Sequence, residues 1–600
     1  MTMYEDKIGG SFLIEESDFN NIFIIEDFDD TSRQMLASTR EFVAKEIYPK
    51  IRELENHNYN LVADIMKKAG ELGLLGLNIP EEYGGFGMGF NLSMLICGEM
   101  SSYSGSVATA YGAHTGIGTY PILYYGNEDV KKRFLPKIAS GEWLSCYNLT
   151  EPNAGSDANA GATIATLDEE KKNYEITGQK IWISNAGFAE VFIVFGRIGD
   201  DKNITGFVLE KSSSNGITLG DEEKKLGLHS SSTRQVFYDK TKVPINQMLG
   251  ERNGGFKIAM NALNVGRIKL CAATTSAAEK VLDISIEYAT QRKQFKNSII
   301  TYGAIKEKLA HMATKIYCSN AALYRAGNDI ESKINALHAT GLDKTKAKLE
   351  SLLSYAVECA IMKVHGSEVI KFVSDEAIQI HGGMGYSADT LVEPAYRDAR
   401  ISRIYEGTNE INRMLIVEMM LKKAIKKELK LFTKMKQIQK ELPLIMLGLN
   451  LNTPKSELKD LKKAVCNLKK LSLITLGLAV SKYKAKLVKE QELLMRIADL
   501  IIETYICESA LLKTEKIIKK NGAQNCETQI KMTINYIQNS LHISRIAAEE
   551  VIMSTTNGIK NKFLLSMSKK LTKPLSYNMK EVRRSISNKL QTDGRYSFTI

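Results

Sequence analysis

The chain has 600 residues, 44% of them apolar and 25% charged, with a formal net charge of +11. This length allows roughly three to five folding units, and the composition is that of a globular protein. No apolar run approaches the ~20 residues that a membrane-spanning helix needs, since the most hydrophobic stretches, 442–451 and 471–480, each end after about ten. The sequence therefore argues against both an integral membrane protein and an extended disordered chain.

The cysteines and histidines form no pattern that is typical of a metal site. Eight cysteines are scattered singly without a CxxC pair, and eight histidines show no HxxxH or HExxH spacing. A reducing compartment is therefore expected, without a disulfide framework. The first thirty residues carry nine acidic residues and a single lysine, Lys7, unlike the basic leaders of secreted or imported proteins. We expect a cytoplasmic protein of bacterial type.

Charge is distributed unevenly along the chain. Residues 421–600 contain 35 Lys and Arg against 15 Asp and Glu, whereas the preceding 420 residues contain 45 against 54. This asymmetry suggests an anionic partner for the tail, either lipid or nucleic acid, or else a lysine-rich solvated face. Few aromatic residues lie between the lysines, so we expect no nucleic acid. A lipid partner would mean peripheral association with the inner membrane through the basic region.

The first half of the chain changes from helical to β patterning. Residues 1–30 form an acidic N-terminal arm, and 31–146 show the apolar spacing of a helical domain. In 147–255, short β-rich runs are separated by Gly, Asn, Asp and Ser turns. This pattern predicts an antiparallel β domain.

Helical patterning returns in the second half. Residues 256–430 form a helical catalytic domain, and 431–600 form a basic helical extension. Within the extension, 549–600 are mixed and are expected to end in an irregular tail. Because strands and helices do not alternate, a Rossmann nucleotide domain is not expected.

Two segments combine glycine with polar side chains in turns. The sequence YNLTEPNAGSD at 147–157 offers N–H groups and hydroxyls to a polar ligand, and KIWISN at 180–185 adds the flat face of Trp182 for a conjugated ring. The sequence QIHGGMG at 379–385 permits close backbone approach to a ligand. Taken separately, each favours an ordinary turn or an ordinary core tryptophan.

A third segment, RIYEGTNE at 403–410, places Glu406 between Tyr405 and Gly407. A glutamate buried in an apolar, water-poor pocket has a raised pKa, as a general base near neutral pH needs. The alternative is a surface glutamate at the start of a helix. Taken alone, the segment favours that alternative.

In combination, these segments resemble the acyl-CoA dehydrogenase family of flavoproteins in their order and spacing. The resemblance covers about residues 31–425 and includes QRKQF at 291–295 and NVGRI at 264–268. The latter and KEQELLMRIAD at 489–499 are most similar to the very-long-chain branch, which carries an extra helical domain. The implied fold is mainly α with a β domain: an N-terminal helical domain, a middle antiparallel β domain, a C-terminal helical bundle and an additional C-terminal helical domain.

The resemblance implies FAD as the cofactor of a homodimer. In the family, FAD lies between the β domain and the second helical domain. Its contacts are carried over to Tyr147, Thr150, Ser156, Trp182, Ser184, Arg292, Phe295, Gln379, Gly382, Gly383, Thr408 and Glu410. Of these, Arg292 and Phe295 would reach the FAD of the neighbouring subunit, where an arginine fork suits a diphosphate. Substrate contacts are carried over to Ser156, Asn264, Arg267, Tyr405, Gly407, Gly112 and Ala113. No metal is implied.

The resemblance also makes Glu406 the catalytic base. It would take a proton from the α carbon of a long-chain acyl-CoA while hydride leaves the β carbon for flavin N5, giving a trans-2-enoyl-CoA in the first step of fatty acid β-oxidation. Some members place the base just before the arginine that matches Arg267, where this chain has Gly266. The implied electron acceptor is an electron-transfer flavoprotein. The alternatives are an acyl-CoA oxidase that uses O₂, and an assembly or scaffold protein that acts through the basic extension.

Substrate chain length is argued from side-chain size. The helix expected over 108–120 aligns with the one that closes the far end of the acyl pocket, and it carries Thr109, Gly112, Ala113 and Gly116. Family members that prefer medium-length acyl chains have bulky polar residues at the positions of Thr109 and Ala113. Small residues leave either a deeper tunnel, in which each buried CH₂ contributes about 0.8 kcal/mol, or room for close helix packing.

One departure from the family lies after Phe295. The usual glycine is replaced there by Lys296-Asn297. Asparagine tolerates left-handed backbone nearly as well as glycine, but lysine does not. We therefore expect an altered turn and a less secure contact of Arg292 across the dimer.

Overall fold

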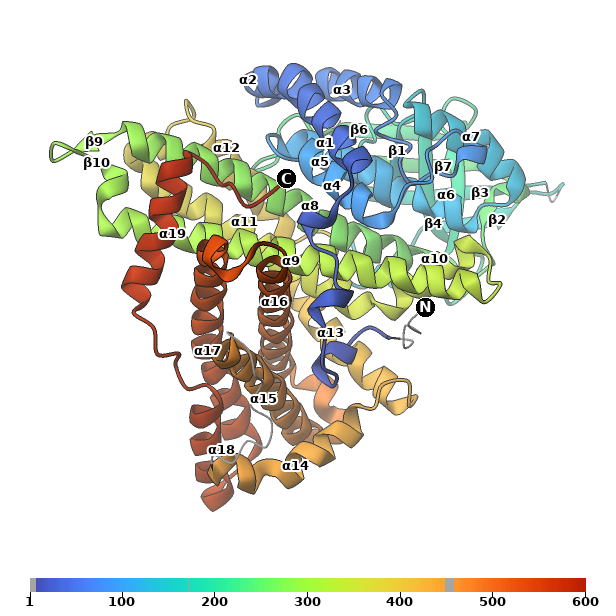
Figure 1. The fold of residues 1–600 in the computed structure, drawn as a ribbon. Coiled ribbons are helices and arrows are strands. Elements are labelled where there is room, and N and C mark those ends of the chain that lie inside the picture. The colour runs from blue at the N-terminus through green and yellow to red at the C-terminus, as the bar shows by residue number, and fades with distance from the viewer. Residues whose placement is uncertain (1–6, 171, 448–457) are drawn as a thin grey trace.

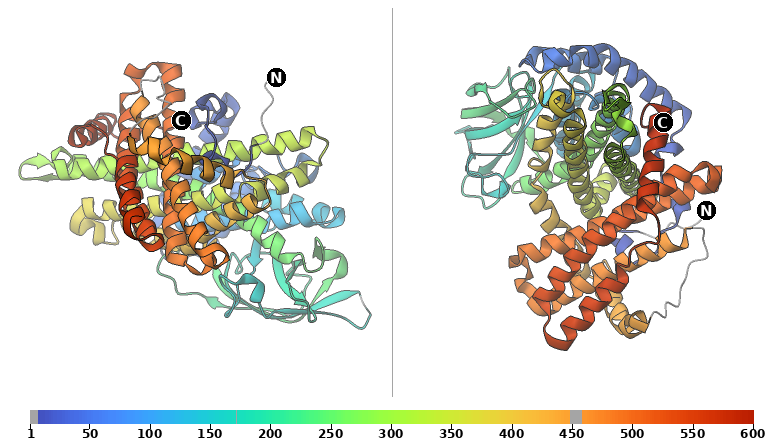
Figure 2. Two further views of the ribbon diagram at one scale, coloured as in Figure 1. Left: turned by 90° about the horizontal axis from the view of Figure 1, so that it is seen from below. Right: turned by 90° about the vertical axis from the view of Figure 1, so that its left-hand side faces the viewer.

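The computed structural model describes residues 7–170, 172–447 and 458–600. Helices, a β domain and further helices follow one another along the chain, as the sequence predicts (Figure 1). Long helices cross the middle of the molecule. The β domain and the C-terminal extension lie on different sides of these helices (Figure 2).

The N-terminal domain is helical. Its helices often begin at side-chain caps: Asp29, Asn58 and Asn127 each accept a hydrogen bond from a backbone N–H that the following helix leaves free. The bounds are α1 (Asp30–Phe42), α2 (Ile51–Leu54), α3 (Tyr59–Glu71), α4 (Phe90–Met100), α5 (Gly105–Gly112), α6 (Tyr120–Tyr125) and α7 (Glu128–Ser140). In the described part of the arm, Phe12 is buried against the ring of Tyr505.

The helix expected over 108–120 is interrupted. Helix α5 ends at Gly112 and continues as a π-helical segment, Ala113–Gly118, before α6 begins at Tyr120. Single π-turns inside helices often mark functional sites, because the widened turn displaces side chains from the regular spacing. The π-helical segment contains Ala113 and Gly116, whereas Thr109 and Gly112 lie in α5.

The middle domain is a β-sheet that packs around its own apolar core. Its strands are β1 (Ser145–Asn148), β2 (Ile164–Leu167), β3 (Asn173–Ser184), β4 (Val191–Ile198), β5 (Thr205–Glu210), β6 (Ile217–Glu222), β7 (Thr233–Pro244) and β8 (Met248–Leu249). Their order is β6-β7-β3-β2-β4-β5-β8, with β1 on β4. Most pairs are antiparallel as predicted, whereas β1 and β2 each pair with β4 in parallel. The parallel pair aligns Tyr147 with Ile193.

The central helices are α8 (Gly255–Gln291), α9 (Gly303–Ala339), α10 (Lys344–Ser354), α11 (Ala356–His381), α12 (Val392–Ala399) and α13 (Asn409–Ile425). Helices α8 and α9 have 37 residues each, and α11 has 26. Helices α8 and α11 pack against each other, and α13 packs on α11. A short hairpin of β9 (Lys293–Gln294) and β10 (Asn297–Ser298) projects beyond the end of α8 (Figure 1).

The C-terminal extension is more helical than the sequence indicates. Its helices are α14 (Leu431–Leu447), α15 (Lys459–Tyr483), α16 (Gln491–Asn521), α17 (Glu527–Thr555), α18 (Gly558–Leu571) and α19 (Met579–Asp593). The prediction of mixed chain over 549–600 is therefore wrong for much of that segment. Helix α19 returns to the central helices, where Arg583 pairs with Glu307 of α9 at 2.6 Å.

One helical stretch is apolar and long enough to cross a membrane by length and composition alone. It covers Lys459–Lys489, and its most apolar window has a mean hydropathy of 1.3, with 56% of that window buried inside the molecule. The core helix of a soluble protein meets the same criterion. Here Leu468 and Leu471 are fully buried between neighbouring helices.

Candidate active site

Glu406 lies in a sharp turn just before α13. Its backbone is left-handed, with φ of 57°, and Gly407 follows with φ of 81°. A glutamate in this conformation costs about 1–2 kcal/mol, so surrounding contacts must hold it. Arg267 of α8 donates from Nε to the carbonyl oxygen of Glu406 at 3.2 Å. Asn412 donates from Nδ2 to the carbonyls of Gly407 and Thr408, at 2.8 and 3.0 Å.

The carboxyl group of Glu406 is held without a close partner. Its Oε2 atom is buried and accepts no hydrogen bond within the described part of the chain. Burial raises the pKa of Glu406 to about 7, against the opposing influence of Arg267 and then of Lys363. A carboxyl group that titrates near neutrality in a water-poor site has the properties of a general base.

Gly266 lies directly against this carboxyl group. A methyl group added there would approach Oε2 of Glu406 to 2.6 Å. The alternative position for a base thus faces the same space as Glu406. A side chain at residue 266 would displace the carboxyl group, so the glycine is required for the observed arrangement.

Tyr147 borders the same region from the β domain. Its ring is buried edge-on against Phe195, and its hydroxyl group is buried without a partner among the described residues. Burial raises the pKa of Tyr147, and the charge of Glu406 adds to the effect. The strand β1 therefore places an unpaired polar atom near the candidate base.

The residues predicted to contact the flavin ring lie on the loop after β1 and at the end of β3. Trp182 is 57% exposed and has a left-handed φ of 61°. The carbonyl oxygen of Thr150 accepts a hydrogen bond from the N–H of Ile181 at 3.0 Å, which joins the two segments. Ser184 is half-buried beside them. A large exposed aromatic face next to hydroxyl groups fits a conjugated ligand.

A buried ion pair that sequence reasoning missed supports this loop. Lys180 donates to Oε1 of Glu151 at 2.6 Å, and both side chains are buried. Glu151 also accepts a hydrogen bond from the N–H of Thr163 at 3.2 Å. These contacts fix the base of the turn that carries Ser156, which is itself exposed.

The segment expected to receive the adenosine half is open to solvent. Gln379, Gly382 and Gly383 are exposed, and a methyl group at either glycine would meet no atom within 4 Å. Thr408 caps α13 by accepting the N–H of Ile411 at 3.2 Å. Glu410 is exposed in the first turn of that helix. The structure thus leaves room for a ligand here.

The hairpin that carries Arg292 and Phe295 closes despite the missing glycine. Phe295 and Lys296 adopt φ of 50° and 70°, the pair of left-handed residues that a tight two-residue hairpin turn needs. The turn therefore forms with two non-glycine residues in left-handed backbone, and Asn297 lies in β10 and not in the turn. Phe295 is 88% exposed, and Arg292 is exposed as well.

The predicted substrate contacts fall into two groups. Asn264 and Arg267 are buried and joined by a hydrogen bond of 2.9 Å beside Glu406. Tyr405 precedes the base, and Ala113 is buried in the π-helical segment. A methyl group at Gly112 would meet no atom within 4 Å, so open space adjoins this helix.

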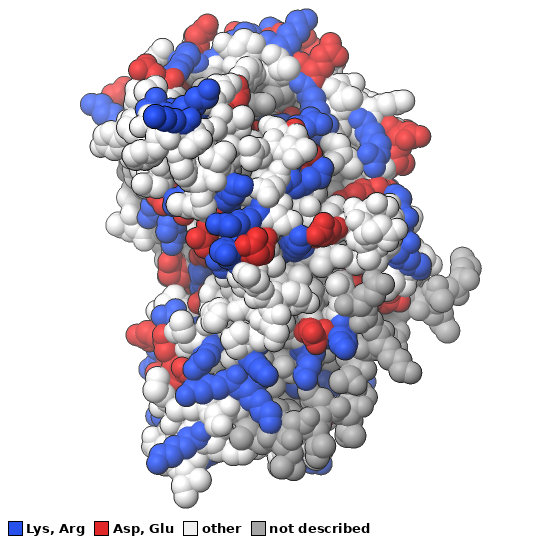
Figure 3. Space-filling model, turned by 60° about the vertical axis from the view of Figure 1, so that its left-hand side comes forward, with Lys and Arg blue, Asp and Glu red and all other residues white. Residues whose placement is uncertain are grey.

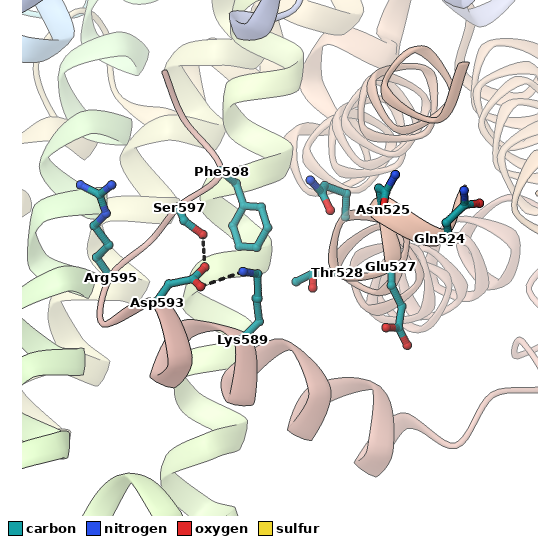
Figure 4. Close-up of a pocket in the computed structure, with 10 residues that line it drawn as sticks. Gln524, Asn525, Glu527, Thr528, Lys589, Asp593, Arg595, Ser597 and Phe598 are labelled. Carbon is teal, nitrogen blue, oxygen red and sulfur yellow. Dashed lines mark hydrogen bonds and ion pairs between the residues drawn. The ribbon is translucent and has the colours of Figure 1, made fainter. Parts of the chain in front are cut away.

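A polar cleft lies elsewhere, between the start of α17 and the end of α19. Its volume is about 640 Å³. Within it, Lys589 and Ser597 point toward Asp593, and the Lys589–Asp593 distance is 2.7 Å (Figure 4). None of the residues predicted to carry the chemistry lines this cleft. Among the described residues, no group of His, Cys, Asp and Glu could hold a metal ion.

Comparisons with known proteins agree with the predicted family. Four family models match successive parts of the chain: "Acyl-CoA dehydrogenase, N-terminal domain" over 29–142, "middle domain" over 146–241, and two models described as "Acyl-CoA dehydrogenase, C-terminal domain" over 253–421 and 467–570. The last of these lies within the predicted additional domain.

Similar proteins extend the likeness to nearly the whole chain. A probable acyl-CoA dehydrogenase of Bacillus subtilis is 39% identical over 576 residues, which is 96% of each protein. The bovine mitochondrial very long-chain specific acyl-CoA dehydrogenase is 37% identical over 58% of this chain and 52% of its own length. The crystal structure of a Bacillus anthracis acyl-CoA dehydrogenase complexed with FAD has a TM-score of 0.95 and 40% identity, covering 98% of this chain and all of that one.

The fold and the site thus define a flavoprotein oxidoreductase with an additional helical domain. The chain belongs to the acyl-CoA dehydrogenase family. The predicted fold, family and enzyme class are confirmed, and FAD, the predicted cofactor, is the one bound by the Bacillus anthracis relative.

Proposed function

We propose that this protein is an FAD-dependent dehydrogenase that introduces the α,β double bond into long-chain acyl-CoA thioesters. The observation that carries the proposal is the buried, unpaired Oε2 of Glu406, whose pKa is raised to about 7. A base of this strength is matched to proton removal at neutral pH.

The residues around the turn prepare Glu406 for that step. Its N–H donates to no group among the described residues, so it is available to a thioester carbonyl oxygen. Stabilising the enolate-like oxygen in this way makes the α proton acidic enough to transfer. Glu406 then accepts the proton from the α carbon.

The open surface around Trp182 fits the predicted cofactor. The exposed tryptophan face and the half-buried Ser184 would hold the ring, and the open glycines Gly382 and Gly383 leave room for the adenosine half. When bound there, FAD supplies the acceptor for the hydride that leaves the β carbon. The unpaired hydroxyl group of Tyr147 is a further candidate to donate to this ligand.

Anaerobic mixing tests the reaction and separates it from the alternatives. The purified yellow protein, mixed with palmitoyl-CoA in the absence of oxygen, is expected to lose its flavin absorbance at 1:1 stoichiometry. An unchanged spectrum would favour a scaffold role for the basic extension. Release of peroxide at the rate of turnover in air would identify an oxidase instead.

The preference for long acyl chains rests on the open space beside Gly112. We expect Gly112→Leu to fill that space and to reduce kcat/KM for palmitoyl-CoA about tenfold, because roughly two methylenes at about 0.8 kcal/mol each lose their site. Turnover of butyryl-CoA by the same variant is the internal control and should stay within about twofold. An equal loss for both substrates would show that the residue serves helix packing instead.

The partners follow from the same family assignment. We propose an electron-transfer flavoprotein as electron acceptor and a homodimer in which Arg292 and Phe295 contact the cofactor of the second subunit. The hairpin projects from the end of α8 (Figure 1), and Phe295 on it is 88% exposed, so both are accessible to a second subunit. Phe295→Asp should lower the dimer fraction in light scattering and the FAD content together.

The basic extension also favours a peripheral site on an anionic membrane. Within this extension, the lysine-rich segment 455–473 is a poor candidate where it is described, because Lys462 pairs with Glu515 at 2.6 Å and Lys469 pairs with Glu508. Residues 455–457 lie outside the described residues. Lys and Arg gather instead over the lower face of the molecule (Figure 3).

The exposed lysines that we assign to this surface lie in the 3-10 helical turn Lys484–Lys489 and at the start of α18. Lys484, Lys486 and Lys489 are exposed beside Val488 in the turn, and Ile559 of α18 is 89% exposed next to Lys560. Lys482 donates to the carbonyl oxygen of Ser554, which brings the turn to the end of α17. Apolar side chains among lysines suit an anionic lipid surface.

Vesicle sedimentation tests this surface. Lys484→Glu/Lys486→Glu should abolish binding to phosphatidylglycerol vesicles at low salt. The matched control Lys132→Glu/Lys202→Glu reverses the charge of two exposed lysines, one in the N-terminal helical domain and one in the β domain. It should leave vesicle binding unchanged. Equal binding by both variants would remove this proposal without affecting the enzymatic one.

A further inference from the structure

Lys363 is a fully buried lysine of α11 whose ammonium group reaches the turn that carries Glu406. Its Nζ donates to the carbonyl oxygen of Gly407 at 2.7 Å and to Oδ1 of Asn409 at 2.8 Å. Asn409 is itself fully buried and bonded to Ser367 of α11. The ammonium therefore ties the turn to the neighbouring helix α11.

The burial of this ammonium group needs an explanation. No carboxylate among the described residues lies within ion-pair distance of Nζ, and an unpaired buried charge is costly. Burial lowers the pKa of Lys363 to about 7, and the charged groups that act on it are Glu406, Arg267, Glu410 and Glu368. Of these, Glu406 has the largest influence.

The buried ammonium group of Lys363 helps to hold the strained turn at Glu406 and Gly407. Glu406 and Gly407 are consecutive left-handed residues, and each carbonyl of the turn is held by a side chain from another position. Arg267 holds the carbonyl of Glu406, and Lys363 holds that of Gly407. With the carbonyls held in this way, Oε2 and the N–H of Glu406 keep no partner among the described residues.

We propose that Lys363 is a positioning residue for the base Glu406, holding the Gly407 carbonyl so that the carboxyl group stays in its reactive orientation and favouring its ionised form. This inference rests on the proposed function, because it requires Glu406 to be the base. Lys363 touches neither substrate nor cofactor in this arrangement and acts through the backbone of the turn.

Two variants separate the hydrogen bond from the charge. Lys363→Met removes both, and Lys363→Gln removes the charge but keeps an N–H donor. Misplacing a catalytic group by about 1 Å costs on the order of 10²-fold in rate, so kcat for palmitoyl-CoA should fall about 100-fold in the Met variant and less in the Gln variant. KM should change less than threefold in both.

The control is a second buried lysine far along the chain. Lys513 of α16 is equally buried and pairs with Glu26 of the N-terminal arm at 3.1 Å. Lys513→Met therefore also removes a buried ammonium group, and it should leave kcat per bound flavin within twofold of the original. If it loses activity as Lys363→Met does, the effect is one of folding, and the positioning role is overturned.

The effect of the Lys363 charge can be measured separately, through the pKa of Glu406. Loss of a nearby cation destabilises the carboxylate, so the pKa of Glu406 should rise from about 7 by on the order of one unit in both Lys363 variants. Infrared titration of the carboxyl C=O band that is absent in Glu406→Gln measures this pKa without turnover. Where the Met variant does not fold, the Gln variant gives the same measurement.

The outcomes distinguish this inference from the proposed function. If palmitoyl-CoA fails to reduce the flavin of the unmodified protein, the proposed function fails, while the infrared titration still reports on Lys363. If turnover is normal and both variants keep their kcat and the infrared midpoint, the positioning role is overturned.

Discussion

Two glutamates of this molecule have buried carboxyl oxygens in opposite environments. Oε2 of Glu406 in the candidate site has no hydrogen-bond partner in the part of the chain that the structure describes, and the pKa of Glu406 is raised to about 7. Glu508 lies where α16 meets α9, and it pairs with Arg325 at 2.8 Å and with Lys469. Burial raises the pKa of Glu508, but the two cations outweigh it, so the net shift is downward.

The difference teaches how to separate a reactive group from a structural one. Both carboxyl groups are buried, so burial alone does not mark the site. At Glu508 the cations are in direct contact and neutralise the charge, whereas at Glu406 the contacts of Arg267 and Lys363 go to the backbone. A buried carboxyl group whose neighbours bind the chain and leave its oxygen free is prepared to take up a proton.

Replacing each glutamate by glutamine tests the difference between Glu406 and Glu508 most directly. Glu406→Gln keeps the size of the side chain but removes the base, and kcat for palmitoyl-CoA should fall on the order of 10³–10⁴-fold. Stopped-flow reduction of the flavin measures this step. Glu508→Gln is the matched control and should reduce the flavin at the original rate per bound FAD. Turnover by Glu406→Gln at an undiminished rate would refute the assignment of the base.

The same replacement at the interface should act on stability instead. Glu508→Gln leaves Arg325 buried without its carboxylate, and losing one partner of a buried pair costs about 3 kcal/mol. We expect a lower thermal midpoint and faster amide hydrogen exchange in α16 and α9. Arg325→Met combined with Glu508→Leu should recover much of the loss, because no unpaired charge remains. Equal midpoints for the single variant and the original chain would show that the pair contributes little.

The sequence predicts much of the fold because its patterns are local. The β-rich runs 191–197 and 206–209 lie within β4 and β5, and the turn clusters between them separate strands as expected. The parallel pairing of β1 with β4 joins segments about 45 residues apart, which no local pattern specifies. The helices after residue 549 were missed because polar residues interrupt their apolar spacing.

In the candidate site, too, local sequence patterns do not specify contacts between distant residues. Glu406 was found through its motif, but the lysines that support the site were not. Lys363 stands within the apolar run AIMKV, and Lys180 stands at the start of the apolar run KIWI. A single lysine in such a run is a signal that could have indicated a buried ammonium group. Their partners, Glu151 and the Gly407 carbonyl, are tens of residues away and follow only from the tertiary structure.

The smallest expected effect is on the pH dependence of folding stability, which should differ between Glu406 and Glu508. The folded-state pKa of Glu406 lies above its ordinary value of 4.5, so its stabilising contribution is complete below pH 4.5 and is lost as pH rises to about 7. Glu406→Gln should therefore gain stability over the original chain across this range, by about 2 kcal/mol after allowing for partial exposure.

Glu508 should show the reverse, because its folded-state pKa is lowered. Its contribution is present above pH 4.5 and is lost as pH falls through the folded-state value, so the deficit of Glu508→Gln should shrink in acid. Thermal midpoints of both variants and the original chain with excess FAD measure the two slopes, between pH 4.5 and 7 for Glu406 and below pH 4.5 for Glu508. Slopes of the same sign would mean that the two carboxyl groups share one environment after all.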